Sequence, residues 1–177
     1  MNIKERLSVR ISLNEIQEII SLINYNDLKK RELFNLLFDS NDKIAFQAAW
    51  VMSHFSSKDN EWLYSKQDEL INEVLICKDI GKRRLILTLL YQQPLVNLRV
   101  DFLDFCFERM ITEREPLAIQ SLCMKMAYEL CRPTLELMQE LRTALEMMEG
   151  ELSPAIYAAK RNILKAMQKG KSLQPFK

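Results

Sequence analysis

One apolar segment of this chain returns in altered form further along the sequence. Its copies share an alanine, a bulky apolar residue, a polar or aromatic residue and then a small one: KIAFQAAWVMSHF at 43–55, LAIQSLCMKMA at 117–127 and AIYAAKRNILKAM at 155–167. Measured between Ala45, Ala118 and Ala155, the steps are 73 and 37 residues, so the first step is close to two periods. A period in the high thirties is typical of arrays of helical pairs, in which each unit buries its apolar face against its neighbours.

The same period predicts a further copy near residue 82. The segment KRRLILTLLYQQ is found there, at 82–93. With only 3 glycines and 5 prolines in 177 residues, the chain has few points at which a helix must break. We therefore expect an all-α fold, a right-handed α-α superhelix of about nine helices with short connections.

Local signals divide the chain into helical pairs. Ser12 followed by Glu15 forms a capping box. Pro116 and Pro154 stand where a first helical turn tolerates proline, and Gly150 is suited to end a helix. The expected single repeat domain spans residues 1–169, with pairs near 12–38, 43–77, 81–111 and 115–149, a closing helix at 153–169 and a loose tail at 170–177.

The repeated segments resemble the first helices of HEAT-type repeats, with Ala or Leu pairs in the packing seam. Over residues 28–169, the order of motifs is similar to that of small bacterial HEAT-like proteins of uncharacterised function. An AAWV-type helix comes first, a KRR-type helix second, a D-x-CF helix at 104–107 third, and a basic helix that starts with Ser-Pro closes the array. The resemblance implies a HEAT/ARM-like solenoid. Such proteins are sometimes labelled adenylosuccinate lyase, but this chain is far shorter than that enzyme and lacks its Ser-Ser, Met-Pro-x-Lys signature loop.

Composition and cysteine usage bound the class of protein. The formal net charge is +1, without the basic excess of a typical nucleic-acid-binding domain. The N-terminus has no apolar signal region, and no run is long enough to span a membrane. The cysteines form no CxxC pair and lie within helical patterns, so we expect reduced, apolar thiols in a cytoplasmic protein: Cys77, Cys106, Cys123 and Cys131.

No enzyme signature is found in the chain. His54 is the only histidine, and its position at a helix end favours a surface residue over a general base. Gly170-Lys171-Ser172 lacks the earlier glycine of a phosphate loop, because residue 165 is a lysine. We expect no catalytic activity and no catalytic, cofactor-binding or metal-binding residues, and we expect no cofactor.

Two kinds of apolar residue have alternative interpretations. Trp50 and Trp62 suit either the core or a stacking surface for a ligand, and their helical spacing beside Ala and Leu favours the core. The methionines of the C-terminal half suit either core filling, which we favour, or an adaptable binding surface: Met124, Met126, Met138, Met147 and Met148.

The expected function is a non-catalytic scaffold that binds a protein or peptide on the concave surface of the array. The chain would act as a monomer or weak homodimer. The second helices of the pairs should line that surface, near 62–77, 97–111 and 134–148, with these exposed positions: Lys66, Glu69, Glu73, Arg99, Glu108, Glu140 and Arg142.

The alternative is a DNA-binding protein related to the HEAT-like alkylpurine DNA glycosylases. Two equivalent helices carry basic residues that together would form a stripe of phosphate contacts: Lys82, Arg83 and Arg84, then Lys160, Arg161, Lys165 and Lys169. The near-zero net charge and the lack of a matching catalytic aspartate oppose this alternative, as does the tendency of helical charge runs to be solvated faces.

Overall fold

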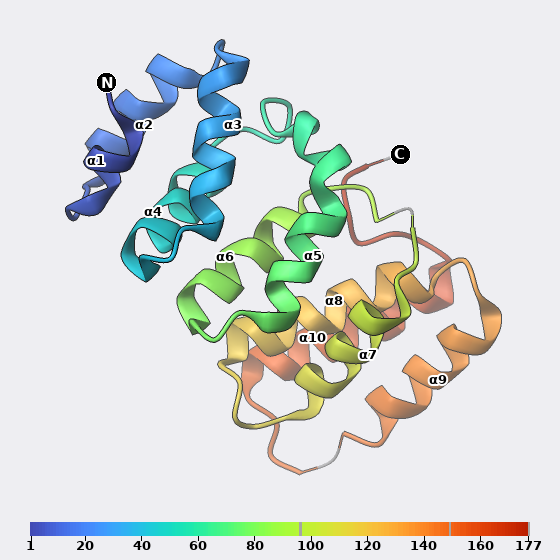
Figure 1. The fold of residues 1–177 in the computed structure, drawn as a ribbon. Coiled ribbons are helices and arrows are strands. Elements are labelled where there is room, and N and C mark those ends of the chain that lie inside the picture. The colour runs from blue at the N-terminus through green and yellow to red at the C-terminus, as the bar shows by residue number, and fades with distance from the viewer. Residues whose placement is uncertain (96, 149, 177) are drawn as a thin grey trace. The chain divides into compact units, whose positions relative to one another are not determined.

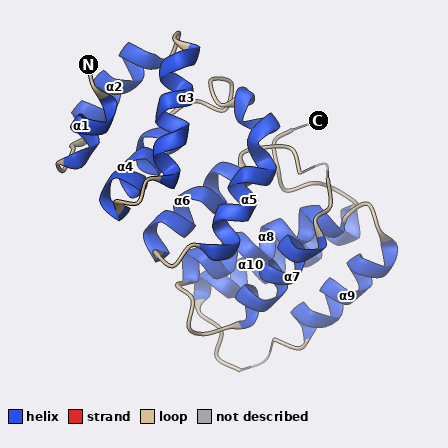
Figure 2. Cartoon of the chain, in the orientation of Figure 1, coloured by secondary structure: helices blue, strands red, loops and turns tan. Residues whose placement is uncertain are grey.

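The computed structural model describes residues 1–95, 97–148 and 150–176. Every regular element in these ranges is helical, as Figure 2 shows. The expected all-α class is therefore confirmed, with ten α-helices and two 3-10 helices in the described residues instead of about nine helices. The chain divides into two units, Met1–Gln93 and Pro94–Lys177. The single domain expected from the sequence stays a prediction.

The first unit is built around helix α4, which packs against α1, α3 and α6 (Figure 1). Helix α5 packs against α6, and α2 lies against α3 and α4. The elements are α1 (Ile3–Ser8), α2 (Leu13–Ile23), α3 (Asp27–Asn35), η1 (Leu36–Phe38), α4 (Asp42–Ser53), η2 (Glu61–Lys66), α5 (Gln67–Ile76) and α6 (Ile80–Tyr91).

The second unit is built around helix α8, which packs against α7, α9 and α10 (Figure 1). Among its fully buried side chains are Met126 and Tyr128 of α8 and Phe102 of α7. The elements are α7 (Val100–Ile111), α8 (Leu117–Cys131), α9 (Leu135–Glu146) and α10 (Pro154–Lys169).

The period seen in the sequence is the spacing of the first helices. Helices α4, α6, α8 and α10 begin at residues 42, 80, 117 and 154, so successive starts are 38, 37 and 37 residues apart. The copy predicted near residue 82 is α6. One further helix, α1, begins 39 residues before α4, at Ile3, and was missed. Its signals are the cap that Asn2 provides to Glu5 N and the buried i, i+4 pair Ile3 and Leu7.

Small residues let the first helices approach one another. Ala45, Ala48 and Ala49 of α4 are all buried. On α6, a Cβ atom added at Gly81 would lie 2.9 Å from Cε2 of Phe46, so the glycine permits the close contact between α4 and α6.

One buried amide of α4 holds the connection between α1 and α2. The Nε2 group of Gln47 donates to the carbonyl oxygens of Leu7 at 2.7 Å and Val9 at 2.6 Å. Its Oε1 atom accepts from Ile11 N at 2.9 Å. A chain leaving a helix has carbonyl groups without helical partners, and a single side chain satisfies two of them here.

Two later first helices carry a side-chain donor at a similar sequence step, but each of these donors bonds to the linker directly before its own helix. Arg83 Nη2 of α6 donates to Cys77 O at 2.6 Å. Gln120 Nε2 of α8 donates to Thr112 O and to Glu115 O, each at 2.8 Å. The three donors stand 36 and 37 residues apart, within one residue of the repeat period. We call these side chains the linker clamps: Gln47, Arg83 and Gln120.

A buried carboxylate attaches the C-terminal segment to the second unit. Glu129 of α8 is 5% exposed and accepts from Ser172 Oγ at 2.9 Å and from Leu173 N at 2.7 Å. Tyr128 Oη donates to the carbonyl of Lys171. The first residues of the predicted loose tail are thus hydrogen-bonded to α8 in the structure.

We predict that Gln47→Leu lowers the free energy of unfolding by about 3 kcal/mol, because it leaves two buried backbone groups and a part-buried one without this partner. Urea unfolding followed by circular dichroism measures the change. Gln17→Leu, on the exposed face of α2, is the control and should stay near wild type. Equal losses in the two variants would show that the clamp contributes nothing specific.

We also predict that truncation after Gly170 lowers the free energy of unfolding by about 1–2 kcal/mol, because Glu129 loses its bonds to residues 172 and 173. The same unfolding experiment measures it. Truncation after Gln174 keeps both bonds and should be nearly neutral. If both truncations were neutral, the segment would be a passive tail.

Candidate functional site

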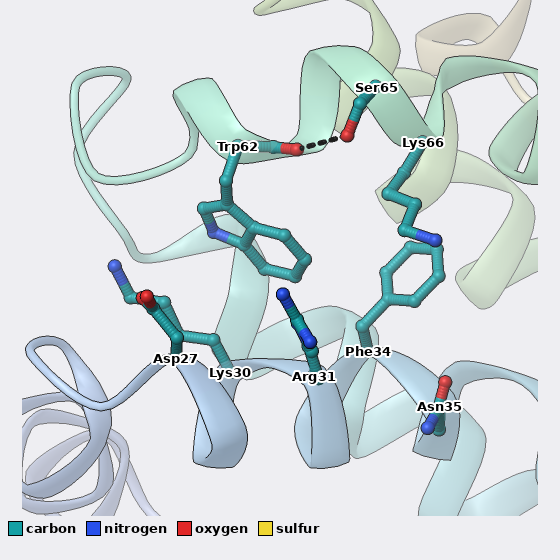
Figure 3. A pocket seen from close by; sticks show the side chains of 8 residues that line it. All are labelled: Asp27, Lys30, Arg31, Phe34, Asn35, Trp62, Ser65 and Lys66. Atoms are coloured by element: carbon teal, nitrogen blue, oxygen red, sulfur yellow. Dashed lines mark hydrogen bonds between the residues drawn. The ribbon is translucent and has the colours of Figure 1, made fainter.

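The first unit carries a pocket of about 410 Å³ between α3 and η2. Helical spacing places its residues on one face of each element, at 27, 30, 31, 34 and 35 of α3 and at 62, 65 and 66 of η2. Figure 3 shows the side chains of Trp62 and Lys66 from η2 and of Arg31 and Phe34 from α3 in the space between the two elements. We call this the aromatic pocket: Asp27, Lys30, Arg31, Phe34, Asn35, Trp62, Ser65 and Lys66.

Two aromatic rings form the walls of the aromatic pocket. Phe34 is 2% exposed, and its ring meets that of Trp62 edge-to-face, with centroids 5.8 Å apart. The Lys66 ammonium lies over the Phe34 ring, 5.6 Å from the centroid, in a cation–π arrangement. These contacts fix the two rings as the apolar part of the pocket.

The three cations of the aromatic pocket differ in whether a nearby carboxylate neutralises their charge. Lys66 pairs with Glu69 at 2.8 Å. Lys30 acts on Asp59, whose pKa is lowered chiefly by a hydrogen bond from Ser56 and in smaller part by the charge of Lys30. Arg31 is exposed and forms no hydrogen bond or ion pair with the described part of the chain.

The second unit carries a larger groove, of about 800 Å³, where the ends of α7 and α9 meet the starts of α8 and α10. Its lining is mostly apolar, and every charged side chain in it is acidic. We call it the methionine groove: Met110, Ile111, Glu113, Glu115, Pro116, Leu117, Gln120, Ala144, Met147, Met148, Glu151, Leu152, Ser153 and Ile156.

Three large apolar side chains of the methionine groove lie open to solvent. Met147 is 73% exposed, Ile111 60% and Leu117 47%. Glu113 and Glu151 are exposed on the rim. The methionines of this half therefore divide between the two interpretations of the sequence, since Met124 and Met126 are buried while Met147 and Met148 line a surface groove.

The second helices line these sites only in part. The ends of α7 and α9 contribute to the methionine groove, and Lys66 lines the aromatic pocket, but the sequence does not predict the contribution from the starts of α8 and α10.

Two of the positions expected to be exposed are not. Glu73 is mostly buried beside Lys82, and Arg99 is half-buried and paired with Asp101. The other expected exposed positions are solvent-accessible: Glu69, Glu108, Glu140 and Arg142.

The basic stripe expected for DNA binding is wrong in its first half. Lys82 is 7% exposed and its ammonium lies 2.6 Å from Glu73 Oε1. Arg83 acts as a linker clamp, which leaves Arg84 as the exposed cation of this run. In α10, Lys160, Arg161 and Lys165, but not Lys169, line a surface hollow of about 610 Å³ with Tyr157 and no acidic side chain.

The single histidine and the two tryptophans can now be placed. His54 is exposed and caps the C-terminal end of α4, as the sequence predicts. Its Nδ1 atom lies 2.9 Å from Trp50 O, and the two rings are edge-to-face. Trp50 and Trp62 are both only partly buried, so the core assignment is incomplete for both residues and Trp62 instead lines the aromatic pocket.

The four thiols are buried and free. Burial raises the pKa of Cys77 and raises the pKa of Cys131 to about 12. The pKa of Cys106 lies well above its ordinary value, first because the thiol is desolvated and second because it is hydrogen-bonded to Cys123. Since the thiolate is the reactive and metal-binding form, Cys77, Cys106 and Cys131 behave as apolar side chains at neutral pH.

Among the described residues, no group of three or more His, Cys, Asp or Glu side chains is placed to hold a metal ion. Within the same ranges, no helix combines the length and the apolar character needed to cross a membrane.

Paired helices that recur every 37 or 38 residues define an α-solenoid. The chain belongs to the HEAT repeat family: a family model described as HEAT repeat domain matches residues 3–167. This match confirms the resemblance seen in the sequence and extends it to α1. Neither the curated proteins nor the solved structures gave a match. HEAT repeats generally mediate protein interactions, and the family is typically non-catalytic.

We predict that native thiols react with a disulfide reagent at pH 8 at least about a hundredfold more slowly than the unfolded chain. Ser57→Cys, at an exposed position, supplies a fast-reacting control. Fast reaction of all four native thiols would contradict the prediction.

The pKa of Cys131 is higher in the folded state than in the unfolded state. The stability that this residue contributes is therefore complete below the unfolded pKa of about 8.5. That contribution is lost as the pH rises toward about 12.

Proposed function

We propose that this protein is a non-catalytic binding module whose methionine groove takes a short, basic amphipathic segment of a partner protein. The observation that carries the proposal is the exposure of Ile111, Leu117 and Met147 side by side in one groove. Exposed apolar side chains gathered in a groove mark an interaction site more reliably than isolated ones. The proposal keeps the cytoplasmic location and the monomer or weak homodimer expected from the sequence.

The chemistry of the lining favours an amphipathic helix as the occupant. Methionine side chains are unbranched and polarisable, so they adapt to different apolar surfaces. A helix lying in a groove presents apolar residues at i, i+3, i+4 and i+7. The groove volume of about 800 Å³ accommodates a few such side chains.

The charge of the rim selects a basic occupant. Glu113 and Glu151 are exposed, whereas Glu115 is 5% exposed and already paired with Arg109 at 2.8 Å. The lining contains no Lys or Arg. Flanking lysines or arginines on the partner would therefore meet unopposed carboxylates, which raises the association rate and discriminates against acidic segments.

A nucleic-acid partner is a second candidate, carried by one observation. The α10 surface combines Lys160, Arg161 and Lys165 with the 58%-exposed Tyr157, without an acidic neighbour in the hollow. The other half of the proposed stripe is occupied by internal contacts of Lys82 and Arg83. This leaves few phosphate contacts, so we rank protein binding first.

We predict that a labelled helical peptide of leucine and lysine binds the protein and that Met147→Asn weakens this binding about tenfold, because an apolar contact is lost. Fluorescence anisotropy measures the affinity. Leu135→Asn changes a side chain on α9 that is 69% exposed and lies outside the groove, and it should leave the affinity unchanged.

Two further arms separate the candidate partners. A leucine–glutamate peptide should bind more weakly than the lysine peptide, and the double change Glu113→Gln with Glu151→Gln should shrink that difference. Duplex DNA should bind weakly, and with a steep dependence on salt if it binds at all. The protein-binding assignment would be refuted if Met147→Asn left the affinity for the peptide unchanged. It would also be refuted if the protein bound DNA more tightly than the peptide.

A further inference from the structure

The contacts within the folded chain leave part of the positive charge of the aromatic pocket without a partner. It brings three cations, one carboxylate and two aromatic rings around about 410 Å³. In Figure 3 the Arg31 side chain extends from α3 toward the ring of Trp62. Lys30 and Lys66 have acidic neighbours outside the pocket, whereas Arg31 forms no hydrogen bond or ion pair with the described residues.

We propose that the aromatic pocket binds a small organic anion, an apolar body about the size of one ring that carries a carboxylate or phosphate group. This site goes beyond the proposed function, because it lies in the first unit and uses none of the groove residues.

The anionic group is assigned to Arg31. A guanidinium presents a planar fork of N–H donors that matches the oxygens of a carboxylate or phosphate. Lys30 and Lys66 flank it on the lining, and Asp27 is the single opposing carboxylate there. The charge balance of the lining is therefore positive, which favours an anion over a neutral or cationic ligand.

The apolar body is assigned to the partly buried ring of Trp62, which the buried ring of Phe34 supports from behind. Phe34 and Trp62 are held edge-to-face at 5.8 Å between centroids, so the wall is formed before a ligand arrives and little side-chain entropy is lost on binding. A volume of about 410 Å³ lies in the range of small-molecule sites and is about half that of the methionine groove. It suits one ring with one charged group better than a polypeptide helix.

Trp62 provides a direct reporter for the test. The chain has two tryptophans, so a Trp50→Phe background leaves the fluorescence of Trp62 alone. The probes are phenylacetate, phenyl phosphate, inorganic phosphate and the neutral benzyl alcohol. N-acetyl-O-phosphotyrosine amide presents the same chemistry in peptide-borne form.

We expect a saturable fluorescence change with phenylacetate or phenyl phosphate. Inorganic phosphate and benzyl alcohol should bind at least about tenfold more weakly, because each lacks one half of the recognised chemistry. Arg31→Gln should weaken binding of the ring-bearing anions about tenfold. Arg84→Gln removes an exposed arginine from the same unit and should change the affinity less than about twofold.

Two outcomes would overturn the proposal even if the Arg31→Gln variant failed to fold. Absence of a saturable change up to about 10 mM of every ring-bearing anion would overturn it, as would equal affinity for phenylacetate and benzyl alcohol. Circular dichroism checks the fold of Arg31→Gln, and equal losses in the two arginine variants would also count against the site. Peptide binding at the methionine groove is measured with Met147→Asn, so failure of one proposal leaves the other standing.

Discussion

The structure depends on satisfying the backbone groups at which one helix stops and the next begins. A helix leaves its last carbonyls without internal partners, and burying them unpaired costs about 1–3 kcal/mol each. In this protein the following first helix supplies the missing donor from its side chains, through Gln47, Arg83 and Gln120. Because each clamp bonds to backbone, it fixes where the linker lies on the helix without requiring a particular linker sequence.

The near-zero net charge conceals local segregation of charge. The lining of the aromatic pocket carries more positive than negative side chains, the charged lining of the methionine groove is entirely acidic, and the hollow on α10 has no acidic residue. A scaffold with such surfaces can discriminate among partners by charge at each site. The total charge of +1 therefore says little about what any one surface binds.

The fold was accessible from the sequence because packing in a repeat array is periodic. The 37-residue step located α4, α6, α8 and α10. It missed α1, which is only six residues long and has too few positions to show a period. The sites were far less predictable. The sequence leaves Trp62 ambiguous and gives no signal for Arg31, since the two residues line one pocket only after the chain has folded back. The expected exposure of Lys82 is wrong because sequence alone does not distinguish a solvated lysine from one buried against Glu73.

The three linker clamps differ in how much chain they enclose. Arg83 and Gln120 reach back 5 to 8 residues, whereas Gln47 reaches back 36 to 40. Closing the longer loop costs about 1.6 kcal/mol more in chain entropy. Local closure allows the later repeats to form from neighbouring residues, while α1 docks only after a long loop has closed. The N-terminal helix is therefore expected to join the folding array late and to be the first part to open from it.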